Sequence, residues 1–312
     1  MKKRVISGSV IFVIIALMIA SRLLTAYVYD AFLIIAGLVA IVEVVRALAN
    51  SKKFVNEVLA STFIFVAYIG IIFGVYNNWS LWDLLIYYVA MLVATCLCSI
   101  LISLLFKDET KTEMIRSSFR GGLAKYIIVK ALTSVFVCVY PTLLIALLIV
   151  INHMPSFVAS DVENVAIFID FVVIATFVCA TFTDTFAMLI GSKVKGPKLI
   201  EKVSPNKTIS GAIGGLLFGI IGILGLYMIY STSETFITVI ESLQITWLPI
   251  TLYAVLSPIL AQAGDILASL LKRKCGVKDY GNIIPGHGGI MDRIDSLIVV
   301  GLCSFILLII CL

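Results

Sequence analysis

The chain has 312 residues, of which 61% are hydrophobic and only 13% are charged. So few polar side chains cannot cover the surface of a water-soluble globule, and the composition therefore excludes that class of protein. The net charge of +5 is not gathered in one patch, which argues against a nucleic-acid partner. We expect an all-α fold, a polytopic transmembrane helical bundle surrounded by a lipid bilayer.

Windows of about 20 apolar residues, the length that crosses a bilayer as a helix, predict about nine spans. They cover residues 5–24, 27–46, 57–76, 81–106, 125–151, 165–190, 210–230, 246–271 and 291–312. Only Arg22 and a few polar residues separate the first two, so eight or ten spans remain open. No small-residue cleavage site follows the first span, and we expect it to be retained.

The basic residues follow the alternation of the loops. All but two of the 23 Lys and Arg residues, Arg22 and Lys130, fall on segments that face the cytoplasm if the N-terminus lies inside. The alternate loops carry acidic residues instead, which is the asymmetry of the positive-inside rule. We therefore expect a multi-pass protein of the cell (inner) membrane, with its N-terminus in, its C-terminus out and its active site on the cytoplasmic face.

No repeat, low-complexity tract or Pro/Gly-rich linker divides the chain, so a single membrane domain over residues 1–312 is predicted. Residues 1–150 are mostly apolar and are interpreted as N-terminal scaffold helices, which could also support a homodimer. Residues 165–312 carry the polar inward loops and are interpreted as the catalytic half. The seven cysteines form no CxxC pair and are interpreted as packing residues.

The first polar stretch is "TDTFAMLIGSKVKGPKLIEKVSPNKTISG", residues 183–211. Asp184 lies in the cytoplasmic third of the sixth span. Lysines and hydroxyl groups then lead into the glycine-rich seventh span: Lys193, Lys198, Ser204, Lys207 and Thr208. Such groups beside a helix N-terminus suit phosphate oxygens. The alternative is a solvated basic loop.

The second stretch ends the eighth span. Asp265 lies nearly two helical turns before the end, with Ser269 four residues later and Lys272 and Arg273 beyond it. An acid at that depth either binds a metal ion or forms a hydrogen bond to a neighbouring helix.

The third stretch is "GHGGIMDRID", residues 286–295. Asp292 and Asp295 lie on one helical face, with Cβ atoms about 5–6 Å apart, close enough to share a cation. His287 lies between glycines, which permit unusual backbone angles and close approach to a ligand. His287 is predicted to bind phosphate or substrate rather than zinc, because the other histidine, His153, falls on the outer side; a structural imidazole is the alternative.

Four aspartates thus predict an acidic, cytoplasm-facing site: Asp184, Asp265, Asp292 and Asp295. Six cations surround it: Lys193, Lys198, Lys207, Lys272, Arg273 and Arg293. Oxygen ligands for a divalent metal, together with cations for phosphates, are the apparatus of phosphoryl and nucleotidyl transfer. The residues predict a metal-dependent reaction on a phosphorylated lipid.

Residues 269–295, "SLLKRKCGVKDYGNIIPGHGGIMDRID", closely resemble the signature of the phosphatidate cytidylyltransferases (CDP-diacylglycerol synthases). The positions in register are Ser269, Lys272, Arg273, Lys278, Asp279, Gly281, Pro285, His287, Gly288, Gly289, Asp292, Arg293 and Asp295. The stretches "DTFAMLIG" and "SPNKTISG" resemble a second conserved region, and the resemblance extends over residues 165–312. Ser210 is a departure, because the family usually has glutamate there.

The resemblance implies the reaction of CTP with phosphatidate to give CDP-diacylglycerol and pyrophosphate, with Mg²⁺ as cofactor and a second, monovalent cation as an open question. Asp265, Asp292 and Asp295 would hold the metal ion. Lys272, Arg273, Arg293 and His287 would join them in catalysis. The substrate-binding residues would be Asp184, Lys193, Lys198, Ser204, Lys207, Thr208, Ser269, Lys278, Asp279, Gly288 and Gly289.

Two alternatives stay open. One is a related CTP-dependent transferase or kinase that acts on a prenyl ether lipid or polyprenol. The other is an ion-coupled secondary transporter, but transporters place intramembrane acids near the midplane and often in two related halves. The acids here crowd one face, which favours an enzyme.

Overall fold

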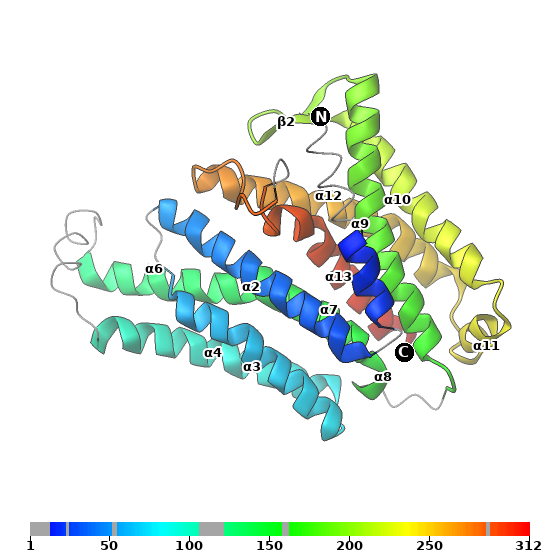
Figure 1. Cartoon of the computed structure of the whole chain (residues 1–312), viewed down its shortest axis with the longest axis horizontal. Helices are drawn as coiled ribbons and strands as arrows, with labels where there is room; N and C mark the ends of the chain where they lie inside the picture. The colour runs from blue at the N-terminus through cyan, green and yellow to red at the C-terminus, as the bar shows by residue number, and fades with distance from the viewer. Residues whose placement is uncertain (1–12, 23–24, 52–54, 106–121, 158–161, 285–287) are drawn as a thin grey trace.

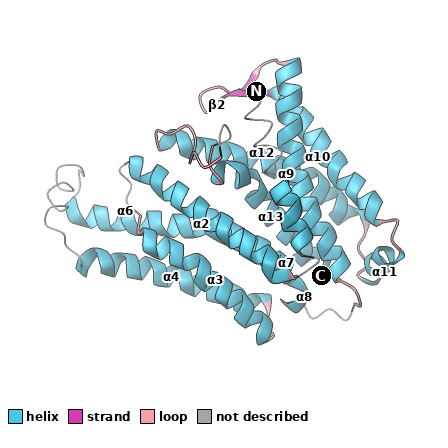
Figure 2. Cartoon of the chain, in the orientation of Figure 1, coloured by secondary structure: helices cyan, strands magenta, loops and turns pink. Residues whose placement is uncertain are grey.

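The computed structural model describes residues 13–22, 25–51, 55–105, 122–157, 162–284 and 288–312, and almost all of its regular structure is helical (Figures 1 and 2). The first part of the chain contains α2 (Ala26–Asn50), α3 (Glu57–Tyr76), α4 (Leu81–Leu105), α6 (Gly122–Val137), the π-helical turn η1 (Cys138–Leu143), α7 (Leu144–Asn152) and α8 (Met154–Phe157). The second part contains α9 (Ala166–Val194), β1 (Lys198–Ile200), β2 (Ser204–Thr208), α10 (Ile209–Tyr230), α11 (Glu234–Ser242), α12 (Trp247–Lys274) and α13 (Met291–Cys311). This confirms the all-α prediction.

In the described part of the chain, eight helices are long and apolar enough to cross a membrane. They are α2, α3, α4, the continuous segment 124–152, α9, α10, α12 and α13, and they confirm eight of the predicted spans. Most of the first predicted span, residues 5–24, lies outside the described residues, although residues 13–21 are helical. The chain is a multi-pass membrane protein.

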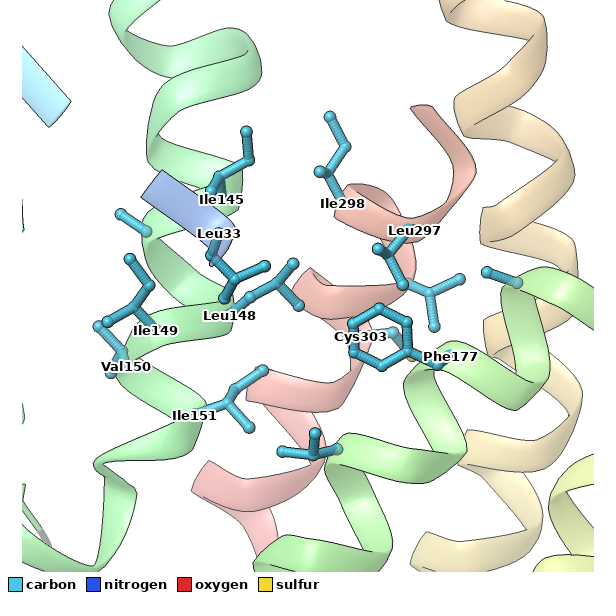
Figure 3. Close-up of a cluster of buried hydrophobic side chains, with 14 of the residues drawn as sticks. Leu33, Ile145, Leu148, Ile149, Val150, Ile151, Phe177, Leu297, Ile298 and Cys303 are labelled. Atoms are coloured by element: carbon cyan, nitrogen blue, oxygen red, sulfur yellow. The ribbon is translucent and has the colours of Figure 1, made fainter. Parts of the chain in front are cut away.

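Helix α13 is the centre of the bundle. It packs against α12, α9, α7 and α2, while α3, α4 and α6 lie on one side of the molecule and α10 and α11 on the other (Figure 1). Figure 3 shows Ile145 and Leu148 of α7 on the side of that helix that faces α13, and Leu297 of α13 beside Phe177 of α9. This apolar contact holds the start of α13 in place.

A two-stranded antiparallel hairpin, β1–β2, leads from α9 into α10, and Lys198 pairs with Thr208. Helix α10 approaches α9 closely because glycines line the contact, as is common between membrane helices. A Cβ at Gly211 would lie 2.6 Å from the Ala187 carbonyl oxygen, and one at Gly215 would lie 2.7 Å from that of Thr183. The close contact brings the hairpin to the same end of the bundle as the C-terminal end of α9.

A buried polar cluster joins the two parts of the chain at the N-terminal end of α2. The Asp30 carboxylate is fully buried, accepts a hydrogen bond from Asn152 Nδ2 (2.9 Å) and pairs with His153 Nε2 (2.7 Å). Arg22 connects Asn152 to Asp170 of α9, with its Nη1 atom 2.8 Å from Asp170 Oδ1. Buried polar groups that are paired in this way stabilise the packing of their helices.

Candidate active site

Three of the four predicted acidic residues come together from three packed helices. Asp184 lies on α9, Asp265 on α12 and Asp295 on α13, and these helices contact one another. Ser296 forms hydrogen bonds with both Asp184 and Asp295, and a Cβ at Gly264, next to Asp265, would lie 2.8 Å from the Asp295 carbonyl oxygen. The structure therefore contains an acidic cluster, which we define as Asp184, Asp265 and Asp295.

Asp265 is paired with a lysine of the hairpin. Lys207 Nζ lies 2.7 Å from Asp265 Oδ2, and both side chains are partly exposed. Ser269, one turn further along α12, lies with its hydroxyl oxygen 3.4 Å from Asp265 Oδ1. Among the residues that the structure describes, Lys207 of the hairpin is thus the one basic residue that forms an ion pair with this cluster.

Asp292 has different partners. Its Oδ1 atom lies 2.6 Å from Lys272 Nζ, and its Oδ2 atom accepts hydrogen bonds from the backbone N–H groups of Tyr280 and Gly289, both at 2.9 Å. Gly288 has a φ of +86°, and a Cβ there would lie 2.8 Å from Asp292 Oδ2. Only glycine tolerates both conditions. Asp292 therefore holds the loop before α13 against Lys272 of α12.

Asp295 is 5% exposed and accepts a hydrogen bond from the N–H group of Ser296. The Ser296 hydroxyl donates to Asp184 Oδ2 at 2.7 Å. In the described ranges, no lysine, arginine or histidine forms an ion pair with Asp295. An intramembrane carboxylate without such a partner is costly, and its usual explanation is a functional one.

The acidic cluster fits a hard divalent cation by its chemistry. Its carboxylates offer oxygen ligands from three helices, and an ion would relieve the repulsion between them. No three acidic, histidine or cysteine residues that the structure describes converge closely enough to enclose an ion as they stand. Binding would therefore need side-chain adjustment, including release of Asp265 from Lys207.

Several predicted site residues have structural partners. Arg273 donates from Nε to the Val203 carbonyl oxygen (3.0 Å) and from Nη1 to the Val277 carbonyl oxygen (3.4 Å), so it connects the hairpin to the end of α12. Thr208 caps α10, because its hydroxyl oxygen accepts a hydrogen bond from the Gly211 N–H group at 3.1 Å. In the described part of the chain, neither side chain forms a hydrogen bond or ion pair with Asp184, Asp265 or Asp295.

The remaining predicted residues are mostly exposed. Lys193, Lys198, Lys278, Asp279 and Arg293 are exposed, Ser204 is half-buried, and the charge of Arg293 acts on Asp184. They are accessible to a soluble anionic ligand. His287 and Pro285 lie outside the described residues. The Ser210 hydroxyl, at the position where the resemblance implies glutamate, donates to the Lys195 carbonyl oxygen and lies 3.1 Å from the Thr208 hydroxyl oxygen.

A cavity of about 200 Å³ opens beside Lys207. Apolar parts of α9, α12 and the hairpin line most of it, including Ala187, Met188, Leu199 and Ile266. The polar contribution comes from Lys207, Thr208, Asn206 and Gln262. A cation at the edge of an apolar cavity suits an amphipathic ligand with an anionic head.

Sequence reasoning missed three residues of this region. Glu43 of α2 accepts hydrogen bonds from the N–H groups of Ile290 and Met291. Tyr280 lies beneath Lys272, whose Nζ atom is 5.3 Å from the ring centroid, and burial raises the pKa of Tyr280 well above its ordinary value. The protonated phenol donates to the Ala268 carbonyl oxygen at 3.1 Å.

The third missed residue is Tyr140 of η1. Its buried hydroxyl has no hydrogen-bond partner among the described residues, and Tyr280 is a neighbour. Of these three residues, Glu43 had a signal in the sequence, since an acidic residue inside an apolar span suggests a function. The tyrosines had none.

Comparison with known proteins agrees with the signature at residues 269–295. The profile of a family described as "Cytidylyltransferase family" matches residues 2–311. A phosphatidate cytidylyltransferase of Rickettsia felis is 36% identical over 124 residues, which cover 37% of this chain and 49% of the relative. Those of Bacillus subtilis (36% over 118 residues; 38% and 40%) and Staphylococcus aureus (39% over 128 residues; 41% and 45%) are similar. The chain spans about half the length of the curated relatives it matches.

Proposed function

Because the chain belongs to the cytidylyltransferase family, we propose that it is a phosphatidate cytidylyltransferase, which converts CTP and phosphatidate into CDP-diacylglycerol and pyrophosphate. One observation carries the proposal. An acidic cluster on three membrane helices adjoins lysines of two different segments, Lys207 of the hairpin and Lys272 of α12. The relatives named above carry the same activity in their names.

The chemistry needs charge and alignment rather than a strong base. A phosphate monoester has a second pKa of about 6, so phosphatidate is largely a dianion at neutral pH. Its oxygen can form the new bond to the α-phosphorus of CTP as the bond to the β-phosphate oxygen breaks and pyrophosphate leaves. What the protein must supply is neutralisation of two anionic substrates and their orientation.

The proposed cofactor is Mg²⁺, held by Asp265, Asp292 and Asp295, with Asp184 close by. When bound, the ion would supply positive charge to phosphate oxygens. In the structure, Asp265 and Asp295 lie in the acidic cluster, whereas Asp292 is paired with Lys272. Ser269 would steady Asp265, and a monovalent cation would add to the neutralisation.

The cations divide between the two substrates in this proposal. Lys207 lies between the acidic cluster and the apolar cavity, and it would bind the phosphate of phosphatidate while the cavity takes the adjoining apolar part. Lys272 and Arg293 would bind the phosphates of CTP, with Lys193, Lys198 and Lys278 at the exposed entrance. Arg273 and Thr208 would support the site through the hairpin.

The proposed setting follows from the substrates. CTP would arrive from the cytoplasm and phosphatidate from the leaflet, so the site would lie on the cytoplasmic face of the cell (inner) membrane. Residues 165–312 would form the catalytic half of a single membrane domain, with residues 1–150 as scaffold and as the surface for a homodimer.

The test is incorporation of labelled CTP into a chloroform-soluble product by the purified protein. Incorporation should require phosphatidate and stop when a chelator removes Mg²⁺. Prenyl ether lipid and polyprenol acceptors, offered in parallel, test the alternative substrates. Incorporation only with one of those would reassign the acceptor, and no incorporation with any lipid would overturn the enzyme proposal.

A further inference from the structure

We propose that Glu43, in the part of the chain interpreted as scaffold, is a positioning residue for the active site. Its carboxylate holds the start of α13 and the loop before it, whose N–H groups bind Asp292, the partner of Lys272. The inference rests on the proposed function and deepens it. Glu43 lies on α2, and the end of this helix lies beside the loop that follows α12 (Figure 1).

The Glu43 carboxylate is buried against the beginning of α13. It is 2% exposed, and its Oε1 and Oε2 atoms accept hydrogen bonds from the N–H groups of Ile290 (3.1 Å) and Met291 (2.8 Å). The first N–H groups of a helix have no partner within it, and negative charge is favourable there. Ile290, the N-cap residue of α13, provides no side-chain cap. A residue 247 positions earlier in the chain therefore takes over this role.

Two glycines of the signature leave room for Glu43. A Cβ at Gly281 or at Gly289 would overlap the Glu43 carboxylate, which is the nearest group to both. Neither glycine is among those with a positive φ in the described part of the chain, which are Gly196, Gly276 and Gly288. The backbone angle does not require glycine at these two positions, and close approach of the carboxylate does.

The loop segments that contact Glu43 also bind Asp292 through backbone N–H groups. The Gly289 N–H group, next to the N–H of Ile290, donates to Asp292 Oδ2. The N–H group of Tyr280, next to Gly281, donates to the same oxygen. Glu43 and Asp292 thus contact both described flanks of the loop, at Tyr280 and Gly281 before it and at Gly289 and Ile290 after it. Displacement of either flank would move Asp292 and, through their 2.6 Å contact, Lys272.

The first experiment compares Glu43→Gln with Asp30→Asn. Asp30 is also a buried acid on α2, but it lies at the opposite end of the helix and pairs with Asn152 and His153. The amide introduced by Glu43→Gln retains one acceptor and points an NH₂ group at a backbone N–H. Since small displacements at an active site are costly, we expect kcat to fall by about ten- to a hundredfold, with a much smaller change in KM for CTP.

The Asp30→Asn variant should lose thermal stability while each folded molecule keeps its kcat. Equal kcat in the two variants, with stability alone reduced in both, would show that Glu43 is only structural and overturn the inference. Glu43→Asp, which keeps the charge on a shorter side chain, should recover part of the kcat lost in Glu43→Gln.

A double-mutant cycle isolates the contact. Gly281→Ala should lower kcat in the wild-type background, because its methyl group meets Glu43. In a Glu43→Ala background the obstruction is gone, so Gly281→Ala should have little further effect. Independent sites would instead give multiplicative losses. Multiplicative losses would contradict the proposed contact.

Amide hydrogen exchange separates this inference from the proposed function. Protection at residues 289–291 should fall in Glu43→Gln and stay at the wild-type level in Asp30→Asn, whatever reaction the protein catalyses. Unchanged protection in Glu43→Gln would overturn the positioning role. If the two variants show this pattern but the wild-type protein incorporates no CTP, the proposed function is overturned and the role of Glu43 stays in place.

Discussion

Lys207 of the hairpin and Asp265 of α12 form an ion pair, with 2.7 Å between Nζ and Oδ2. The hairpin itself is held by Arg273, which donates to the Val203 carbonyl oxygen. A basic residue from an extramembrane hairpin therefore neutralises one carboxylate of the acidic cluster. In the proposed reaction, Asp265 would hold the metal ion, and the same ammonium group would then be available to bind phosphate.

Replacement of Lys207 tests this exchange. In Lys207→Gln the acidic cluster loses its paired cation, and we expect turnover to fall by about a hundredfold or more, because positive charge stabilises the transferring phosphoryl group. Lys202→Gln, an exposed position in the same hairpin turn, is the control and should keep its activity. Initial rates at saturating CTP and phosphatidate measure the effect. Near-normal turnover in Lys207→Gln would mean that the ion pair is only structural.

Asp292→Asn and Asp295→Asn should both reduce turnover by orders of magnitude, but their stabilities should differ. An amide oxygen at position 295 can still accept the Ser296 hydrogen bond, so this variant should remain as stable as the wild type. Asp292→Asn weakens the contact with Lys272 and with two backbone N–H groups, and should lower the melting temperature. Turnover, thermal melting and Mg²⁺ titration are measured together. Unimpaired turnover in both variants would remove these aspartates from the metal site.

Gly276 and Gly288, two glycines with positive φ between α12 and α13, make a matched pair. Gly276 has a φ of +71° and open space where a Cβ would lie, whereas at Gly288 (φ +86°) the Cβ would press on Asp292. Gly276→Ala should therefore cost only backbone strain, about 1–2 kcal/mol of stability, and keep turnover. Gly288→Ala should lose stability and also most of its turnover. Equal turnover in the two variants would argue against the importance of the Asp292 position.

Ser210→Glu introduces the acid that the family resemblance implies at this position, and should leave activity intact or raise it. Ser210 is the second residue of α10, where a negative charge is favourable to the helix. The lost hydrogen bond to the Lys195 carbonyl oxygen is at the surface and is expected to cost little. Comparison of initial rates checks this. A folded but inactive variant would mean that the site is built around serine.

Much of this protein is readable from its sequence because the signals are local. Each of the eight described membrane helices is a continuous apolar segment, and hydropathy along the chain is enough to find it. Asp184, Asp265 and Asp295 could be assigned to one membrane face because loop charges alternate. The signature at residues 269–295 placed the chain in a family before any contact was known.

The partners of these residues were decided by packing alone. The three-residue spacing of Asp292 and Asp295 puts them on one helical face. In the structure, however, Asp292 contacts Lys272 and the loop, whereas Asp295 lies near Asp184 and Asp265. Glu43 meets Ile290 only because α2 packs against α13, a contact across 247 positions. Hydropathy reports which face of a segment avoids water, but which helices become neighbours depends on how all the apolar faces fit together, and that is a property of the whole bundle.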